Sequence, residues 1–349
     1  MANVKSVQLS KDGTNFREIP GSSAEISSDS ASTDDSVFGT TFTSSQPTLI
    51  TWTMSSNGYY KGFPGYKATL KRTGTSTALA SPAATTVDPD DALKFYITNR
   101  AQSLLDNTVA VDVLDDGVSV DPEDIEYIDF LQGAVKFVTG YIVGGAITID
   151  GNYLPLAPIC FAQNFTLTQS ADTENITDFC AAQANGGYAV FSYQQQNAEL
   201  SMDGFYSDTS GFFADLLSRD QVIVEINPDG EGKSVARGYF RASSHSQSGD
   251  VGSTETESIT YALAVPEGVR FPFSWYHAAD SGIPEAIKWV LEAWSERAPL
   301  FVRYRAENSA VRKDGSVLVS DTSLTSGIES VNDFSFDFQG SGGITEVSV

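Results

Sequence analysis

Apolar and polar residues alternate with a period of two along several stretches, most completely between residues 161 and 263. This alternation is typical of strands with one buried face. A short helical pattern at 209–219 interrupts the series. The predicted strands of this unit are 165–168, 188–193, 198–202, 221–226, 234–242 and 258–263. A polar connection is expected at 169–177.

Parts of this unit occur twice. Residues 31–38 are similar to residues 171–179. Each of these segments follows a short predicted strand, at 24–27 and at 165–168 respectively. A stronger echo aligns 237–263 with 313–338 and places Glu257 opposite Glu329. Both of these aligned segments, 237–263 and 313–338, follow a predicted helix and a predicted strand. Self-similarity at the spacing of one domain predicts a duplicated module.

The clearest helical pattern covers residues 284–297. Ile287, Val290 and Leu291 recur at helical spacing, Ser281 is a candidate N-cap, and Pro284 suits the first turn. A sheet is expected to cover the apolar face of this helix.

Residues 93–155 predict a compact series of short strands, after a linker-like stretch at 73–89 that is rich in Ala, Thr, Ser and Pro. The expected order is the front half of a first module at 1–85, an inserted or connecting β module at 86–156 and a second module at 157–266. A helix-plus-strand half at 267–349 then completes the first module. A sequential split near residue 157 is the alternative.

Charge narrows the classes of function. The 349 residues include 21 basic and 45 acidic side chains, a net charge of −24. Because binding to DNA depends on Lys and Arg, this balance disfavours a DNA-binding role, and solubility is its simplest explanation. No run of apolar residues is long enough for a membrane span, and the first residues lack an apolar signal core, so we expect a cytosolic protein without membrane contact.

Candidate chemistry is sparse. His245 and His277 lie far apart in sequence, and neither a nucleophile elbow nor a phosphate loop is present. Residues 227–232 resemble a calcium loop, but Gly238 stands where the bidentate Glu is required. We expect no enzyme, no cofactor and no metal site. Cys160 and Cys180 are expected to be reduced, packed thiols, with a disulfide as the alternative.

The charge balance changes after the 284–297 helix, where cations gather within a short stretch. A contact with the acidic surface of a neighbouring copy and a solvated strand face are both consistent with it. The candidate interface cations are Arg297, Arg303, Arg305, Arg312 and Lys313.

Three segments together resemble the tail tube (major tail) proteins of long-tailed bacteriophages: 173–179, 199–204 before a helix, and the terminal strand series that ends at 336–340. The resemblance covers 157–349 and, more weakly, 20–72, whereas 86–156 depart from it. It implies a mainly β fold: a duplicated β-sandwich or β-barrel module, each copy with a flanking helix, plus an additional small β module.

The resemblance also implies a function. Tail tube proteins assemble as rings of six modules that stack into a hollow tube, so three chains with two modules each would close a ring. The expected localisation is the virion tail, assembled in the host bacterial cytoplasm. Expected partners are other copies, the tape-measure protein, the tail terminator and the distal tail proteins. Double-stranded DNA would pass an acidic lumen without specific binding.

On this interpretation, the polar loops at 28–48 and 169–186 reach between subunits or rings, with mobile surface as the alternative. The candidate residues are Ser30, Asp34, Asp35, Phe38, Asp172, Glu174, Asp178 and Phe179. Deleting Ser28 to Ser45 is predicted to leave a soluble protein that forms no tubes.

Two other classes of function stay open. A virion or cell-surface adhesin could bind carbohydrate through the aromatic stretch at 59–66. A hydrolase could use a pair of carboxylates and would show a pH-dependent activity that one Asp substitution removes.

Overall fold

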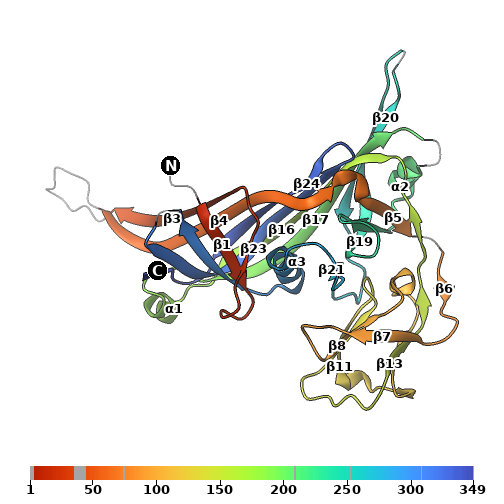
Figure 1. Ribbon diagram of the computed structural model, residues 1–349, viewed down its shortest axis with the longest axis horizontal. Helices are drawn as coiled ribbons and strands as arrows, with labels where there is room; N and C mark the ends of the chain where they lie inside the picture. The colour runs from red at the N-terminus through yellow and green to blue at the C-terminus, as the bar shows by residue number, and fades with distance from the viewer. Residues whose placement is uncertain are drawn as a thin grey trace.

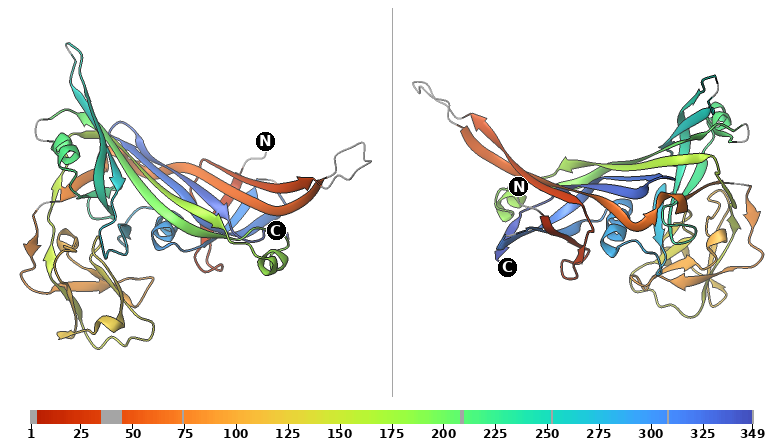
Figure 2. Two further views of the ribbon diagram at one scale, coloured as in Figure 1. Left: turned by 180° about the vertical axis from the view of Figure 1, so that it is seen from behind. Right: turned by 45° about the horizontal axis from the view of Figure 1, so that its top comes forward.

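The structure is a computed structural model that describes residues 4–34, 45–73, 75–207, 210–251, 253–307 and 309–348. It confirms the prediction of a mainly β protein. A large sheet of long strands forms an elongated body, and a smaller sheet forms a separate lobe below one end, away from both termini (Figures 1 and 2).

Two long hairpins build the large sheet. One joins β3 (Ser23–Asp34) to β4 (Ser45–Pro64), and the other joins β16 (Ala162–Asn175) to β17 (Phe191–Phe205). The strand β16 therefore contains most of the predicted polar connection at 169–177, and that prediction is wrong. Ser170, Thr173 and Glu174 pair with β17, because cross-strand pairing outweighs weak strand propensity.

Each hairpin pairs with a set of elements that we call its back half, and the two back halves are equivalent. The first back half contains α3 (Glu285–Glu296), β22 (Leu300–Ala306), β23 (Val311–Gly327) and β24 (Val331–Gly340). The second contains α2 (Phe212–Ser218), β18 (Val222–Asn227), β19 (Ser234–Ser248) and β20 (Thr256–Leu263).

The pairing orders of the two sets are the same. The terminal module has the order β3-β4-β24-β23-β22, and the central module has the order β16-β17-β20-β19-β18. The β23–β24 pair and the β19–β20 pair each have one register shift, at equivalent places: between Val319 and Asp321 and between Ala242 and Ser244. The duplicated module is therefore present in the sheet topology.

Register corrects one predicted alignment of the repeat. Ile26 lies opposite Met54 and Leu167 opposite Leu200, which makes 24–27 equivalent to 165–168, as the sequence indicates. Glu257, however, corresponds to Phe334 and not to Glu329, because the two are the partners of Gln247 and Leu324. Alternation of apolar residues does not distinguish between registers that differ by two residues.

The hydrophobic core lies between the large sheet and the elements beneath it. Helix α3 buries Ile287, Val290 and Leu291 against this sheet, as its spacing predicts. The predicted cap is wrong: Pro284 is the N-cap residue, no side chain caps the helix, and the Ser281 hydroxyl is buried without a partner.

The smaller sheet spans residues 83–150. It has its own core, which includes Ile97, Val135, Phe137 and Ile149. Its strands are β7 (Ala83–Val87), β8 (Lys94–Ile97), β9 (Asp112–Asp115), β10 (Val118–Ser119), β11 (Ile125–Asp129), β12 (Ala134–Phe137) and β13 (Ile147–Asp150). The linker interpretation of 73–89 is wrong for β7, which pairs with β8 and β13.

The remaining elements complete the sheet edges and connections. They are β1 (Val4–Ser10), β2 (Arg17–Glu18), β5 (Thr69–Thr73), β6 (Thr77–Ala78), β14 (Asn152–Tyr153), β15 (Leu156–Pro158), α1 (Phe179–Ala184), β21 (Phe273–His277), β25 (Thr345–Ser348) and three 3-10 turns (Gly65–Lys67, Arg100–Gln102, Pro122–Asp124).

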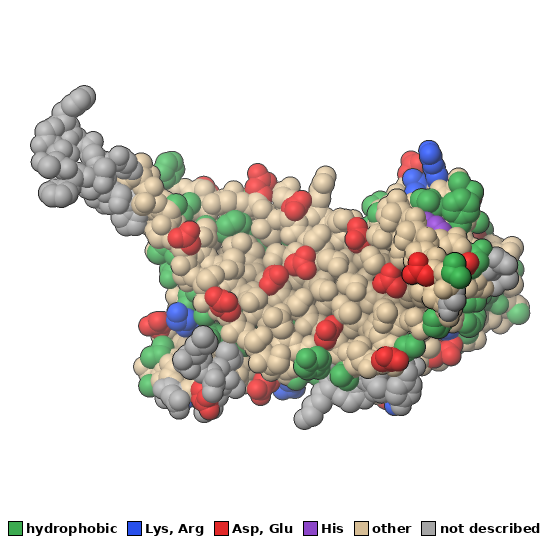
Figure 3. Space-filling model, turned by 90° about the horizontal axis from the view of Figure 1, so that it is seen from above, with side chains coloured by type: hydrophobic (Ala, Val, Ile, Leu, Met, Phe, Trp, Pro, Cys, Tyr) green, Lys and Arg blue, Asp and Glu red, His purple; other side chains and the backbone are tan. Residues whose placement is uncertain are grey.

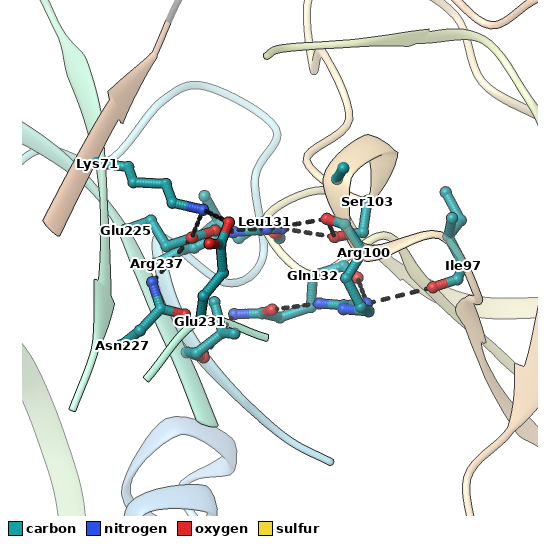
Figure 4. A network of polar contacts seen from close by, with 12 residues as sticks. Lys71, Ile97, Arg100, Ser103, Leu131, Gln132, Glu225, Asn227, Glu231 and Arg237 are labelled. Carbon is teal, nitrogen blue, oxygen red and sulfur yellow. Dashed lines mark hydrogen bonds and ion pairs between the residues drawn. The ribbon is translucent and has the colours of Figure 1, made fainter. Parts of the chain in front are cut away.

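A buried polar network fixes the small lobe to the central module (Figure 4). Arg237 on β19 binds Glu225 on β18 at 2.6 and 2.7 Å and donates to the Leu131 carbonyl and the Ser103 hydroxyl of the lobe. Burial would raise the pKa of Glu225, but the Arg237 guanidinium holds it below its usual range. Every bond of Arg237 to the lobe is charge-assisted, so these bonds contribute strongly to the contact between the lobe and the central module.

Candidate functional site

One face of the large sheet carries mainly hydroxyls and carboxylates. Along β16, Phe165 and Leu167 point into the core, while Thr166 and Thr168 point to the opposite face. Because alternation and register hold in the neighbouring strands, the same division runs from β3 to β19. Helix α3 and the small lobe lie on the other side (Figure 1).

We call this surface the hydroxyl-carboxylate face. Its members are Glu25, Ser27, Asp29, Thr53, Ser55, Asn57, Thr166, Thr168, Ser170, Glu199, Ser201, Asp203, Arg241, Ser244, Ser246, Ser248, Ser258, Thr260, Asp321, Ser323, Thr325, Asp333, Ser335 and Asp337. Figure 3 shows red carboxylates spread over this surface and the few blue side chains near the margins of the view.

The face is continuous across the junction of the two modules. One row of directly paired residues passes across six strands, in the order Asp333, Thr325, Thr166, Ser201, Thr260 and Ser244. The Thr166 and Thr325 hydroxyls lie 3.3 Å apart where β16 meets β23. The junction therefore adds no apolar or basic strip to the surface.

Electrostatically the face is acidic. Among its members, Arg241 is the only cation, whereas carboxylates occur on β3, β17, β23 and β24. Asp321 and Asp337 are direct cross-strand partners. Burial and, secondarily, the Asp337 carboxylate raise the pKa of Asp321 to about 6, and burial also raises the pKa of Asp337. A polyanion near this face meets repulsion and no cationic ligand.

The predicted loop residues are mostly strand residues. Ser30 lies in β3, Asp172 and Glu174 are exposed in β16, and Asp34 is the last described residue of β3. The prediction that they belong to loops is wrong, because all four lie in strands of the two hairpins. Asp35 and Phe38 lie outside the described residues.

The tip of the β16–β17 hairpin carries the other two candidates. Asp178 caps α1 by accepting a hydrogen bond from the Ala181 amide at 2.6 Å. Phe179, the first residue of α1, is 96% exposed. An aromatic side chain exposed on a capped helical turn is a candidate for a contact with another molecule.

The candidate cations follow α3 in the chain: Arg297 is the C-cap residue of this helix, and the other four lie in β22 and β23. Arg303 binds Asp314 and stacks on Phe16, and Arg312 also binds Asp314. Further contacts are those of Arg305 with the Ser309 carbonyl and of Arg297 with the Gln194 carbonyl, and Lys313 lies in β23 opposite Tyr304. Partners within the chain therefore hold four of these five cations.

The residues considered for chemistry are dispersed. His245 approaches Glu257 at 3.4 Å, and burial lowers the pKa of His277 to about 3, which keeps its ring neutral. Both cysteines are free and exposed, not packed as expected. Nowhere in the described ranges do three or more His, Cys, Asp or Glu side chains converge to hold a metal ion. None of the described helices is long and apolar enough to cross a membrane.

Sequence reasoning missed the face itself. The signal was present in runs such as 164–170, where Thr and Ser alternate with Phe and Leu. A single strand of this kind predicts a solvated surface. Only the register of eight strands shows that their polar sides form one uninterrupted surface.

Comparisons with known proteins give no match to a family model and none to a curated protein. Among solved structures, the chain is similar to a protein of the tail of an empty gene transfer agent particle with C6 symmetry, at 15% identity and a TM-score of 0.28, over 36% of this chain and 87% of that one. A second similarity, to a protein of the native gene transfer agent virion, has 16% identity and a TM-score of 0.27 over 32% and 85%.

Proposed function

We propose that this chain is a structural subunit of a phage-type tail tube, a non-catalytic protein whose copies form stacked rings around a lumen for double-stranded DNA. The observation that carries the proposal is the hydroxyl-carboxylate face. A channel for DNA has to lie close to phosphates without binding them, and binding requires Lys or Arg to release counterions. Arg241 is the only cation among the described residues that we assign to this face.

The duplicated module supports a ring of three chains. The terminal and central modules have the same pairing order, so each chain supplies two similar sectors of a ring. With the six modules per ring that the tail-tube resemblance implies, three copies close it with pseudo-sixfold symmetry. The small lobe lies on the side of the sheet opposite the face, so a tube with this face toward the lumen would carry the lobe outside.

Electron microscopy of the purified chain across a concentration series tests assembly. We expect rings with three-fold symmetry and six similar lobes, or hollow tubes of stacked rings. We expect a crowding agent, added to the same series, to lower the protein concentration at which rings appear. Monomers throughout both series would contradict the proposal.

A charge reversal tests the lumen. Glu199→Lys with Asp203→Lys places two exposed cations per chain on the face, and assembled rings of this variant are expected to retain DNA in a salt-dependent gel shift, which wild-type rings do not. The matched control is Asp121→Lys with Glu123→Lys, the same charge change on exposed residues of the small lobe. Equal retention by both variants would show that the face does not line the lumen.

A further inference from the structure

The two modules of one chain are joined by a strand pair. Residues 164–170 of β16 pair antiparallel with 321–327 of β23, and Thr168 lies opposite Ser323. The front strand of the central module thus completes the edge of a back strand of the terminal module. This pair is the only direct strand pairing between the two sets of five strands among the described residues.

The equivalents of these two strands both have an open edge. In the described residues β3, which corresponds to β16, pairs with β4 alone. Strand β19 corresponds to β23, and its residues 244–248 pair with β20 alone. Strand β18 joins the other edge of β19 only as far as Phe240. Each open edge leaves backbone donors and acceptors available to another strand.

We propose that β3 of one copy pairs with β19 of the next, in the same way that β16 pairs with β23 within a chain. Transferring the internal register through the module equivalence places residues 23–29 antiparallel to 244–250, with Ser27 opposite Ser246. The proposal names the partner, a second copy, and the residues that close the ring. It rests on the proposed function.

Burial on β3 agrees with a missing neighbour. Phe165 and Leu167 of β16 are 4% and 1% exposed beneath the internal pair. Their equivalents, Ala24 and Ile26, point toward the same core but are only partly buried. A strand added beside β3 covers these two side chains as β23 covers Phe165 and Leu167.

The chemistry of the facing residues fits this register. On the hydroxyl-carboxylate face, Glu25 lies opposite Ser248 and Asp29 opposite Ser244, so each carboxylate meets a hydroxyl. A shift by one residue turns polar side chains into the core. A shift by two in one direction places Glu25 opposite Asp250, where like charges repel. The proposed register also extends the acidic face without a break from one copy to the next.

Cysteine cross-linking tests the pairing. In a background with Cys160→Ser and Cys180→Ser, the variant Ser27→Cys with Ser246→Cys is assembled, oxidised with copper phenanthroline and examined on a non-reducing gel. We expect bands at two and three times the monomer mass and none above, because a closed ring of three chains has three such pairs. Either single variant is expected to give no band above the dimer.

Two matched variants control for geometry. Thr168→Cys with Ser323→Cys is the internal equivalent and should form a disulfide within each chain, which shows that this pair geometry is oxidisable. Ser27→Cys with Ser244→Cys lies on the same face but two residues out of register, and it should cross-link at least ten-fold less.

The outcomes separate the two proposals. Rings or tubes that form in the microscope without the Ser27 to Ser246 cross-link, while the internal control oxidises, overturn the β3–β19 pairing and leave the proposed function intact. Equal cross-linking in the shifted variant overturns the register. Absence of both assembly and cross-linking overturns both proposals.

Discussion

At the scale of single residues, Arg237 and Glu225 show how much one buried charge pair can control. Arg237 is 2% exposed and bridges two strands of the central module to the small lobe. Arg237→Met leaves the Glu225 carboxylate buried beside only Lys71 and Asn227. We expect it to lower the free energy of unfolding by about 3–5 kcal/mol, measured by urea denaturation.

The control for this change is an exposed ion pair of similar length. Lys233 and Asp280 lie 3.3 Å apart at the surface, and Lys233→Met should cost less than about 1 kcal/mol. Equal losses from the two substitutions would contradict the assignment of Arg237 as the residue that fixes the lobe.

Asp321 predicts a pH dependence. Its pKa is raised in the folded chain to about 6, above its usual value near 3.8, by burial and by Asp337. The folded state therefore binds this proton more tightly than the unfolded state, and its contribution to stability decreases as pH rises from about 4 to about 6. Asp321→Asn should flatten the fall of the melting temperature in this window and raise it at pH 8.

Asp333→Asn is the matched control, since it removes one carboxylate from the same face at a site opposite Thr325 and Tyr59. The wild-type slope between pH 4 and 6 should persist in this variant. If Asp321→Asn also retains it, the pH dependence has another origin.

At the scale of elements, α1 separates folding from assembly. Phe179→Ser removes a fully exposed ring from a capped turn, so the free energy of unfolding should change by less than about 0.5 kcal/mol. If the β16–β17 tip contacts a neighbouring ring, this variant should form rings but shorter tubes, measured as tube length by electron microscopy. Tubes of wild-type length would exclude Phe179 from ring stacking.

Ile142→Ser provides the comparison, because Ile142 is 86% exposed on the small lobe and should leave tube length unchanged. The deletion of Ser28 to Ser45 is less specific than either substitution. Residues 28–34 pair with 45–52, so this deletion also removes part of β3 and leaves the first half of β4 without its partner strand.

The helices and strands also show which sequence patterns predicted secondary structure and which did not. Helix α3 was predictable because Ile287, Val290 and Leu291 repeat at helical spacing and must be buried on one side. The second half of β16 was missed because Asp172 and Glu174 have low strand propensity, and the partner of Glu174 is Ser192, on another strand. Pairing, which is non-local, decided their conformation.

At the scale of the whole molecule, net charge predicts how assembly responds to salt. Each copy carries a net charge of −24, so bringing copies together is opposed by repulsion that salt screens. We expect the concentration at which rings appear, measured by light scattering, to be at least several-fold lower in 0.5 M than in 0.05 M NaCl. A higher threshold in 0.5 M NaCl would instead favour attraction between the Arg303 to Lys313 cations and a neighbouring acidic surface.

The sequence alone determined the mainly β class, the duplicated module and the acidic balance, because these depend on local alternation, self-similarity and composition. The tertiary structure decided the register of the repeat, the assignment of Glu257, the burial of Arg237 and the single polar face. Each of these depends on which strands lie side by side. Register sets which residues face one another and which edge stays open, and a period of two is compatible with several registers.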